Sequence, residues 1–147
     1  MAERIAAEVL KPQLTDGREI AFLDVREHGQ YGEGHPFFSV PMPYSLLEPR
    51  ATKLLPCRLT RIVLMDDGDG VADKAAARLG QLGYKELVVL EGGAPGWVAA
   101  GYTLYKGVNV PSKTFGELLE HACDTPRLTA EALQSLREQE NGVVVLD

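Results

Sequence analysis

The sequence predicts an α/β fold, with a central parallel sheet of about five strands and helices on both of its faces. Short apolar runs recur along the first two thirds of the chain and alternate with segments of helical periodicity. Glycine- and proline-rich turns separate these segments. Strands that alternate with helices are typical of βαβ units, whose crossover connections make neighbouring strands parallel.

The composition indicates one ordinary globular domain, with room for an appendage. The chain has 147 residues, of which 45% are hydrophobic, and a net charge of −6. This acidic balance argues against nucleic acid or an anionic membrane as a partner, because both attract basic patches. No apolar run approaches the roughly 20 residues that span a bilayer, and residues 1–10 lack the apolar core of a secretory signal. We therefore expect a soluble, cytoplasmic protein.

The elements before residue 60 follow from hydrophobic periodicity. The pattern predicts helices over residues 6–14, from Glu27 onward and over residues 45–55, and a strand at residues 20–23. Residues 37–40 form the next apolar run, which Pro41 and Pro43 close. Pro49 lies inside the third helix, where its ring is tolerated only in the first turn.

The clearest element is a strand, turn and helix over residues 62–82. Ile62–Met65 is a continuous apolar run, as expected of a strand covered on both faces. Gly68 and Gly70 allow a sharp turn, and the alanines and leucines that follow have helical spacing. Such a junction points backbone N–H groups into one small volume at the positive end of a helix dipole, which favours an anion or a thiolate.

The residues of this turn argue against a site for an anion or a thiolate. The turn carries Asp66, Asp67 and Asp69, with Asp73 one turn later and only Lys74 to offset them. Carboxylates stabilise the start of a helix, but they repel an incoming anion. The spacing does not match a calcium loop, and neither cysteine has metal-ligand spacing. We therefore predict no metal site and no cofactor.

The remaining elements include a strand over residues 86–90, a helix over 95–100 and a linker over 103–113. Thr114 is expected to start a helix through a capping box, and Thr129 a second one. Residues 130–147 align without gaps on residues 7–24 at a constant offset of 123, and both stretches read helix, turn and strand. We predict a domain over residues 1–105, followed over 106–147 by a helical linker and the first strand of a truncated second repeat.

Four motifs occur in the order and spacing of a known family. They are Asp24-Val25-Arg26, Gly34-His35, the strand–turn–helix, and Leu90-Glu91-Gly92-Gly93-Ala94-Pro95-Gly96-Trp97. Together they resemble the rhodanese-like domain of thiosulfate sulfurtransferases over roughly residues 5–105. The segment from Gly107 to Lys113 resembles the joint between rhodanese domains in tandem. The resemblance implies a structural ion pair of Asp24 with Arg26. We expect a hydrogen-bonded structural role for His35 after Gly34, and a core role for Trp97.

In that family a cysteine opens a six-residue loop after the fourth strand, backbone N–H groups hold its persulfide, and an arginine commonly closes the loop. Here Asp66 stands at the cysteine position and Val71 at the arginine position. Gly68 and Gly70 are present, and Asp69 stands where a glycine is common. A carboxylate cannot form a persulfide. The resemblance thus implies a vestigial loop, formed by Asp66, Asp67, Gly68, Asp69, Gly70 and Val71.

We predict a non-catalytic rhodanese module of a thiosulfate sulfurtransferase, with a structural or regulatory role toward neighbouring rhodanese domains of the same chain. Exposed apolar surface and self-association are expected in the C-terminal region. Two alternatives remain open. The acidic loop could bind a metal or a cationic ligand, or Cys57 or Cys123 could support weak sulfur transfer.

Overall fold

A computed structural model describes residues 2–124, 126–139 and 143–145. The chain forms two compact units, Met1–Pro111 and Ser112–Asp147. The predicted domain boundary at residue 105 and the second repeat remain predictions.

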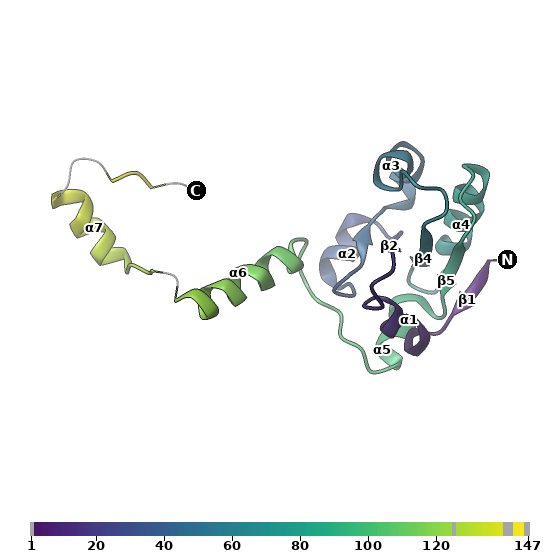
Figure 1. Cartoon of the computed structure of the whole chain (residues 1–147), viewed down its shortest axis with the longest axis horizontal. Helices are drawn as coiled ribbons and strands as arrows, with labels where there is room; N and C mark the ends of the chain where they lie inside the picture. Colours follow the sequence, from purple (N-terminus) through teal and green to yellow (C-terminus); the bar gives the residue numbers. More distant parts are fainter. Residues whose placement is uncertain (1, 125, 140–142, 146–147) are drawn as a thin grey trace. The chain divides into compact units, whose positions relative to one another are not determined.

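The first unit is built on a five-stranded parallel sheet (Figure 1), which confirms the predicted fold class. In sheet order the strands are β1 (Glu3–Ile5), β5 (Leu87–Leu90), β4 (Arg61–Met65), β2 (Ile20–Asp24) and β3 (Val40–Pro41). Hydrophobic periodicity did not predict β1, because three residues are too few to show alternation. Among the described residues, β1 pairs with β5 alone, in parallel register.

Six helical segments lie wholly within the described part of this unit, and four of them cover the two faces of the sheet. The six are α1 (Ala7–Gln13), α2 (His28–Glu33), the 3₁₀ turn η1 (Tyr44–Leu46), α3 (Leu47–Leu54), α4 (Val71–Gln81) and α5 (Gly93–Ala99). One core cluster joins the sheet to α3 and α4, and the other joins it to α1 and α5. Along β4, Ile62 and Leu64 belong to the first cluster, whereas Val63 and Met65 belong to the second. From Ile62 to Met65 the strand is apolar, because both of its faces are buried there.

Most of the apolar run at residues 37–40 lies outside the sheet. Only Val40 and Pro41 pair with β2. The ring of Phe37 instead packs edge-on against Phe38 and Tyr105, with centroids 5.0 and 5.5 Å apart. Because Pro41 has no backbone N–H to donate, the ladder is short at this edge of the sheet.

The second unit contains α7 (Ala130–Gln139) and all of α6 (Val110–Cys123) except its first two residues, which belong to the first unit. The capping box predicted at Thr114 is wrong, because α6 already begins at Val110 and Thr114 lies within it. Pro111 is tolerated there, since N–H groups in the first turn have no helical partner. At α7 the prediction is confirmed: the Ala132 N–H donates to the Thr129 hydroxyl over 3.1 Å.

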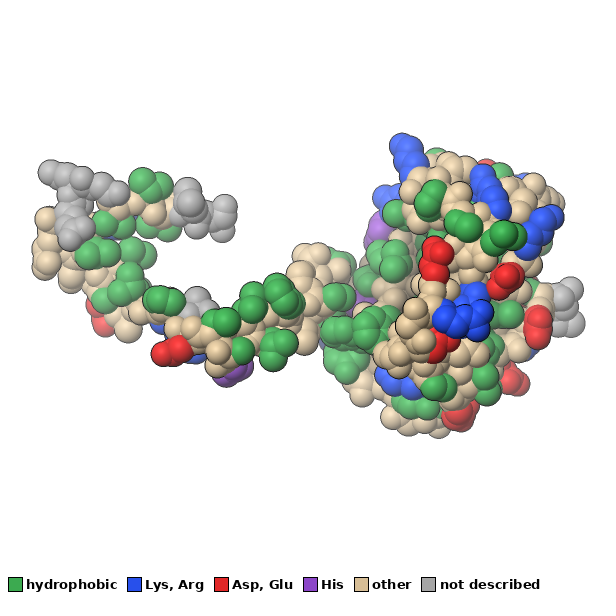
Figure 2. All heavy atoms as spheres, in the orientation of Figure 1, with side chains coloured by type: hydrophobic (Ala, Val, Ile, Leu, Met, Phe, Trp, Pro, Cys, Tyr) green, Lys and Arg blue, Asp and Glu red, His purple; other side chains and the backbone are tan. Residues whose placement is uncertain are grey.

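Apolar side chains are exposed in the second unit, as the sequence predicted for this region. Phe115, Leu118 and Leu119 of α6 are 60%, 63% and 41% exposed, and hydrophobic side chains gather along this helix in Figure 2. The predicted strand at the end of the chain is not formed over residues 143–145, and residues 146–147 lie outside the described part. Among the described helices, none is long and apolar enough to cross a membrane.

Candidate functional site

The loop between β4 and α4 folds around the carboxylate of its own first residue. Asp66 follows β4, and its side chain turns inward, so that the residue is only 2% exposed. Its Oδ1 accepts the Gly68 N–H over 2.9 Å. Its Oδ2 accepts the N–H groups of Gly70 and Ala72 over 3.0 and 2.9 Å. The anion cradle predicted from the sequence is therefore present, and the Asp66 carboxylate occupies it.

These hydrogen bonds keep Asp66 ionised. Burial would raise the pKa of this carboxyl group, because desolvation disfavours the charged form. The N–H groups of Ala72, Gly68 and Gly70, together with the Asp69 side chain, outweigh burial and hold the pKa below its usual range. Asp66 thus contributes a fixed negative charge at neutral pH.

An Asp66→Asn variant is expected to lose stability at neutral pH by about 1–3 kcal/mol, because buried N–H groups lose a charged acceptor. A depressed folded-state pKa contributes stability that is present above the unfolded pKa of about 3.9 and is lost as the pH falls through the folded value. The difference in unfolding free energy between wild type and variant should therefore shrink on acidification below about pH 4. Denaturant unfolding at a series of pH values measures this difference. A difference that does not change with pH would contradict a lowered pKa of Asp66 in the folded state.

A buried ion pair fixes the neighbouring loop. Asp24, at the end of β2, is fully buried and accepts two hydrogen bonds from the Arg26 guanidinium, at 2.9 and 2.6 Å. Arg26 also donates to the Gly34 carbonyl over 2.7 Å and to Asp67 over 2.9 Å. Burial lowers the pKa of Arg26, but the carboxylates of Asp24 and Asp67 outweigh it and raise the pKa. The predicted structural ion pair of Asp24 with Arg26 is thus present, and it also holds the second residue of the acidic loop.

The turn after β5 packs directly on the acidic loop. The Ala94 N–H donates to the Asp66 carbonyl over 2.7 Å. A Cβ placed on Gly93 would lie 2.3 Å from that carbonyl oxygen and 2.8 Å from the Gly68 nitrogen. The φ of Gly93 is +58°, a region that side-chain-bearing residues rarely adopt. Only glycine allows the two backbones to approach this closely.

A Gly93→Ala variant should therefore unfold more readily than a Gly101→Ala variant. Gly101 has a φ of +85° and open space where its Cβ would lie, so alanine there adds only backbone strain of about 1–2 kcal/mol. At Gly93 the same strain is joined by a clash with backbone atoms that must move. Thermal unfolding of both variants measures the difference, and equal loss of stability would show that the close approach does not matter.

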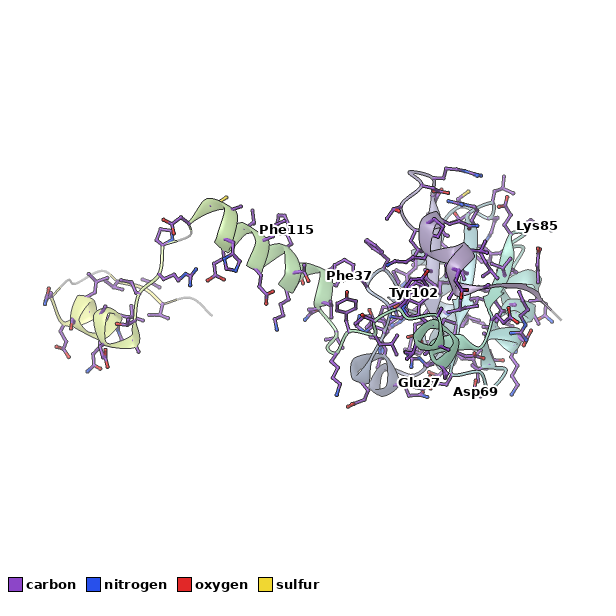
Figure 3. The ribbon with its side chains drawn as sticks, turned by 90° about the horizontal axis from the view of Figure 1, so that it is seen from below. Glu27, Phe37, Asp69, Lys85, Tyr102 and Phe115 are labelled. Atoms are coloured by element: carbon purple, nitrogen blue, oxygen red, sulfur yellow. The ribbon has the colours of Figure 1, made fainter. Side chains whose placement is uncertain are left out.

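The two turns and β1 enclose an open hollow of about 270 Å³ at the carboxyl ends of the strands. Its lining residues are Arg4, Asp66, Gly68, Gly70, Glu91, Gly92 and Gly93. Arg26, which follows β2, donates to Asp67, which follows β4, over 2.9 Å, and Figure 3 labels Glu27 and Asp69 of the same two segments. The loops that follow β2 and β4 thus meet at one edge of the sheet.

Two residues of this region had no local signal in the sequence. Arg4 lies on β1, and its Nη2 donates to Asp73 of α4 over 2.6 Å. Gln30 lies on α2 and donates to Asp67 over 2.9 Å. Their partners are 69 and 37 residues away in the chain, a separation that only the fold closes.

The other predicted motif residues lie in packed parts of the first unit. His35 is buried and stacks on Tyr31, and its Nδ1 lies 2.9 Å from the Tyr31 carbonyl oxygen. Trp97 is 2% exposed and packs against Phe22 and Tyr102. Its indole N–H donates to the Thr103 carbonyl over 3.2 Å. Gly34 precedes His35, and a Cβ there would touch the Leu104 side chain.

Neither cysteine lies in the loop. Cys57 is exposed and precedes β4, whereas Asp66 follows β4. The two residues therefore lie beyond opposite ends of a strand whose five residues span roughly 15 Å. Cys123 is exposed and ends α6 in the second unit. Val71, at the position where the resemblance implies an arginine, is the first residue of α4 and has no charge to offer an anion.

The acidic side chains of the loop do not converge on a common point. Asp66 binds the backbone, Asp67 binds Arg26 and Gln30, and Asp69 accepts the Val71 N–H over 3.2 Å. Within the described residues there is no group of three or more His, Cys, Asp or Glu side chains placed to hold a metal ion.

Comparisons with known proteins agree with this architecture. The family described as Rhodanese-like domain matches residues 6–100. A thiosulfate sulfurtransferase of Pseudomonas aeruginosa is 29% identical over 135 residues, which cover 80% of this chain and 49% of that protein. A crystal structure of thiosulfate sulfurtransferase from Pseudomonas aeruginosa has a TM-score of 0.89 at 42% identity, covering 93% of this chain and 26% of that one.

A crystal structure of the Alr3790 protein from Anabaena sp. has a TM-score of 0.65 at 28% identity, covering 88% of this chain and 98% of that one. The chain spans about half of the length of the curated relative and about a quarter of the Pseudomonas crystal chain.

Proposed function

The chain belongs to the rhodanese-like domain family, and from that premise we propose that its first domain is a non-catalytic sulfurtransferase module. Sulfur transfer in this family requires a thiolate at the start of the loop after β4, and here that residue is Asp66. One observation carries the proposal. The Asp66 carboxylate accepts three backbone N–H groups and so fills the cradle with a group that cannot carry sulfur.

The electrostatics of the loop support the same proposal. A sulfur donor such as thiosulfate is a dianion, and the hollow presents Asp66 and Glu91 to it. Among the described residues that line the hollow, Arg4 is the one cation, and it is already paired with Asp73. Val71 supplies no charge where the family commonly has arginine. Both the nucleophile and the anion-binding cation are therefore replaced.

The role that we propose for such a module is structural or regulatory, toward neighbouring rhodanese domains of the same longer protein. The repeat supports it, since Arg127 and Leu128 align with Arg4 and Ile5 of β1 at the same offset of 123. Helices α1 and α7 begin at aligned positions, Ala7 and Ala130. Leu128 is 64% exposed, although Ile5 packs against a core cluster. A following domain would cover this surface, and in its absence self-association through the same surface is the expected alternative.

The chain is also proposed to act in a reducing compartment such as the cytoplasm. Cys57 and Cys123 are both free and exposed, and exposed thiols persist where cellular reductants prevent disulfide formation.

The experiment that tests the proposal incubates the chain with thiosulfate, records its intact mass and assays thiocyanate formation from cyanide in the same sample. The expected result is no added sulfur and no turnover. A persulfide mapped to Cys57 or Cys123, together with turnover, would overturn the proposal. Thermal shift with Ca²⁺ or Mg²⁺ tests the remaining alternative, because a ligand of the folded state must raise its stability.

A further inference from the structure

The acidic loop contains two of the three Asp–Gly pairs in the chain, Asp67-Gly68 and Asp69-Gly70. The third pair, Asp16-Gly17, lies in the turn before β2. An aspartate followed by glycine is chemically vulnerable, because glycine has no side chain to hinder attack by its own backbone nitrogen on the preceding carboxyl carbon. We propose that Asp67 and Asp69 are latent sites of isoaspartate formation, and that the Asp66 carboxylate suppresses the reaction by holding the nitrogens of Gly68 and Gly70.

The reaction is an isomerisation with no oxidant or reductant. The glycine nitrogen bonds to the side-chain carboxyl carbon, a carboxyl C–O bond breaks, and one water leaves to give a cyclic imide. Water then adds to the backbone carbonyl carbon of the ring and breaks its bond to nitrogen. The chain now runs through the aspartate side chain and is one methylene longer at that point.

The structure places both attacking nitrogens under the control of Asp66. The Gly68 N–H donates to Asp66 Oδ1 over 2.9 Å, and the Gly70 N–H donates to Oδ2 over 3.0 Å. The acceptor is buried, and the third hydrogen bond, from Ala72, fixes it to the start of α4. Each nitrogen must leave this acceptor and rotate before it can reach the preceding carboxyl carbon.

The two electrophiles are not equally protected. The Asp67 carboxylate is held by Arg26 and Gln30, each over 2.9 Å. Asp69 is exposed, and its carboxylate accepts one N–H, that of Val71, over 3.2 Å. Once Asp66 no longer holds Gly70, we expect Asp69 to isomerise first and Asp67 more slowly.

The test ages wild type, Asp66→Ala, Asp66→Asn and Asp73→Asn at neutral pH and physiological temperature. Isoaspartate is quantified at each site by peptide mapping. Asp73→Asn is the matched control, since it changes a carboxylate in the first turn of α4 that binds Arg4 and neither glycine nitrogen. Two internal references are Asp16-Gly17, outside the loop, and deamidation at Asn141-Gly142. Circular dichroism confirms that each variant is folded.

We expect isomerisation at Asp69 to rise about tenfold in Asp66→Ala, the factor that one hydrogen bond to a charged acceptor represents. The rise should be smaller in Asp66→Asn and absent in Asp73→Asn, with both references unchanged. Unchanged or slower isomerisation in a folded Asp66→Ala protein would overturn the proposal. If that variant unfolds, the Asp66→Asn protein decides, because its side-chain oxygen cannot hold both nitrogens as the carboxylate does. The outcome is independent of sulfurtransferase activity and therefore of the proposed function.

Discussion

Replacing Asp66 with cysteine is expected to create a persulfide-forming site. The three backbone N–H groups that now bind the carboxylate would face a thiolate at the start of α4. Such surroundings lower a thiol pKa from about 8.5 toward or below neutrality. The thiolate would attack the outer sulfur of thiosulfate, break its S–S bond and release sulfite. Because wild type has no thiol in the loop, the expected change is from none to one added sulfur per loop.

The cysteine variant is best made in a Cys57→Ser, Cys123→Ser background, so that any added sulfur is assigned to the loop. Asp66→Ser in the same background is the matched control, since a hydroxyl at neutral pH does not form a persulfide. Adding Val71→Arg should increase the rate, because it places a cation where the anionic donor must approach. If a folded cysteine variant gained no sulfur, with or without this arginine, the result would contradict the prediction. It would show that the loop lacks further features, besides the thiol, that persulfide formation needs.

Removing the Arg26 side chain is expected to destabilise the first unit by about 3–5 kcal/mol, the range for breaking a buried ion pair from one side. The reason is the charge left behind: Asp24 would remain fully buried without its partner. The Gly34 carbonyl and Asp67 would also lose the donors that now connect them. Against a typical total stability of about 5–15 kcal/mol, this loss is large.

Denaturant unfolding of Arg26→Ala measures this loss, and Arg78→Ala is its control. Arg78 pairs with Glu48 across α4 and α3, but both side chains are about half exposed, so its removal should cost no more than about 1 kcal/mol. An Asp24→Asn, Arg26→Met double variant removes both charges and should recover part of the loss. If Arg26→Ala and Arg78→Ala lowered the free energy of unfolding equally, burial would not make the Arg26 ion pair more important for stability than an exposed one.

Local patterns in the sequence were sufficient for most of the first unit. A buried strand between two layers is apolar throughout, and Ile62–Met65 shows this without any tertiary information. Some motif residues also reveal the local backbone conformation. Gly92 and Gly93, for example, have a positive φ, which favours glycine at these positions. Prediction was poorer where an element is short or lies at an edge. Three residues of β1 and two of β3 are too few to show a period.

Residue identities alone established that the loop lacks a thiol and carries excess negative charge, because chemistry at one position does not depend on the fold. Only the tertiary structure decided how that charge is used. Asp66 turns inward onto its own backbone, Asp67 pairs with Arg26, and Asp73 pairs with Arg4. The last two contacts join segments that are distant in the chain and meet where the carboxyl ends of parallel strands converge. The direction of a side chain depends on the partners within reach, and these become neighbours only when the sheet assembles.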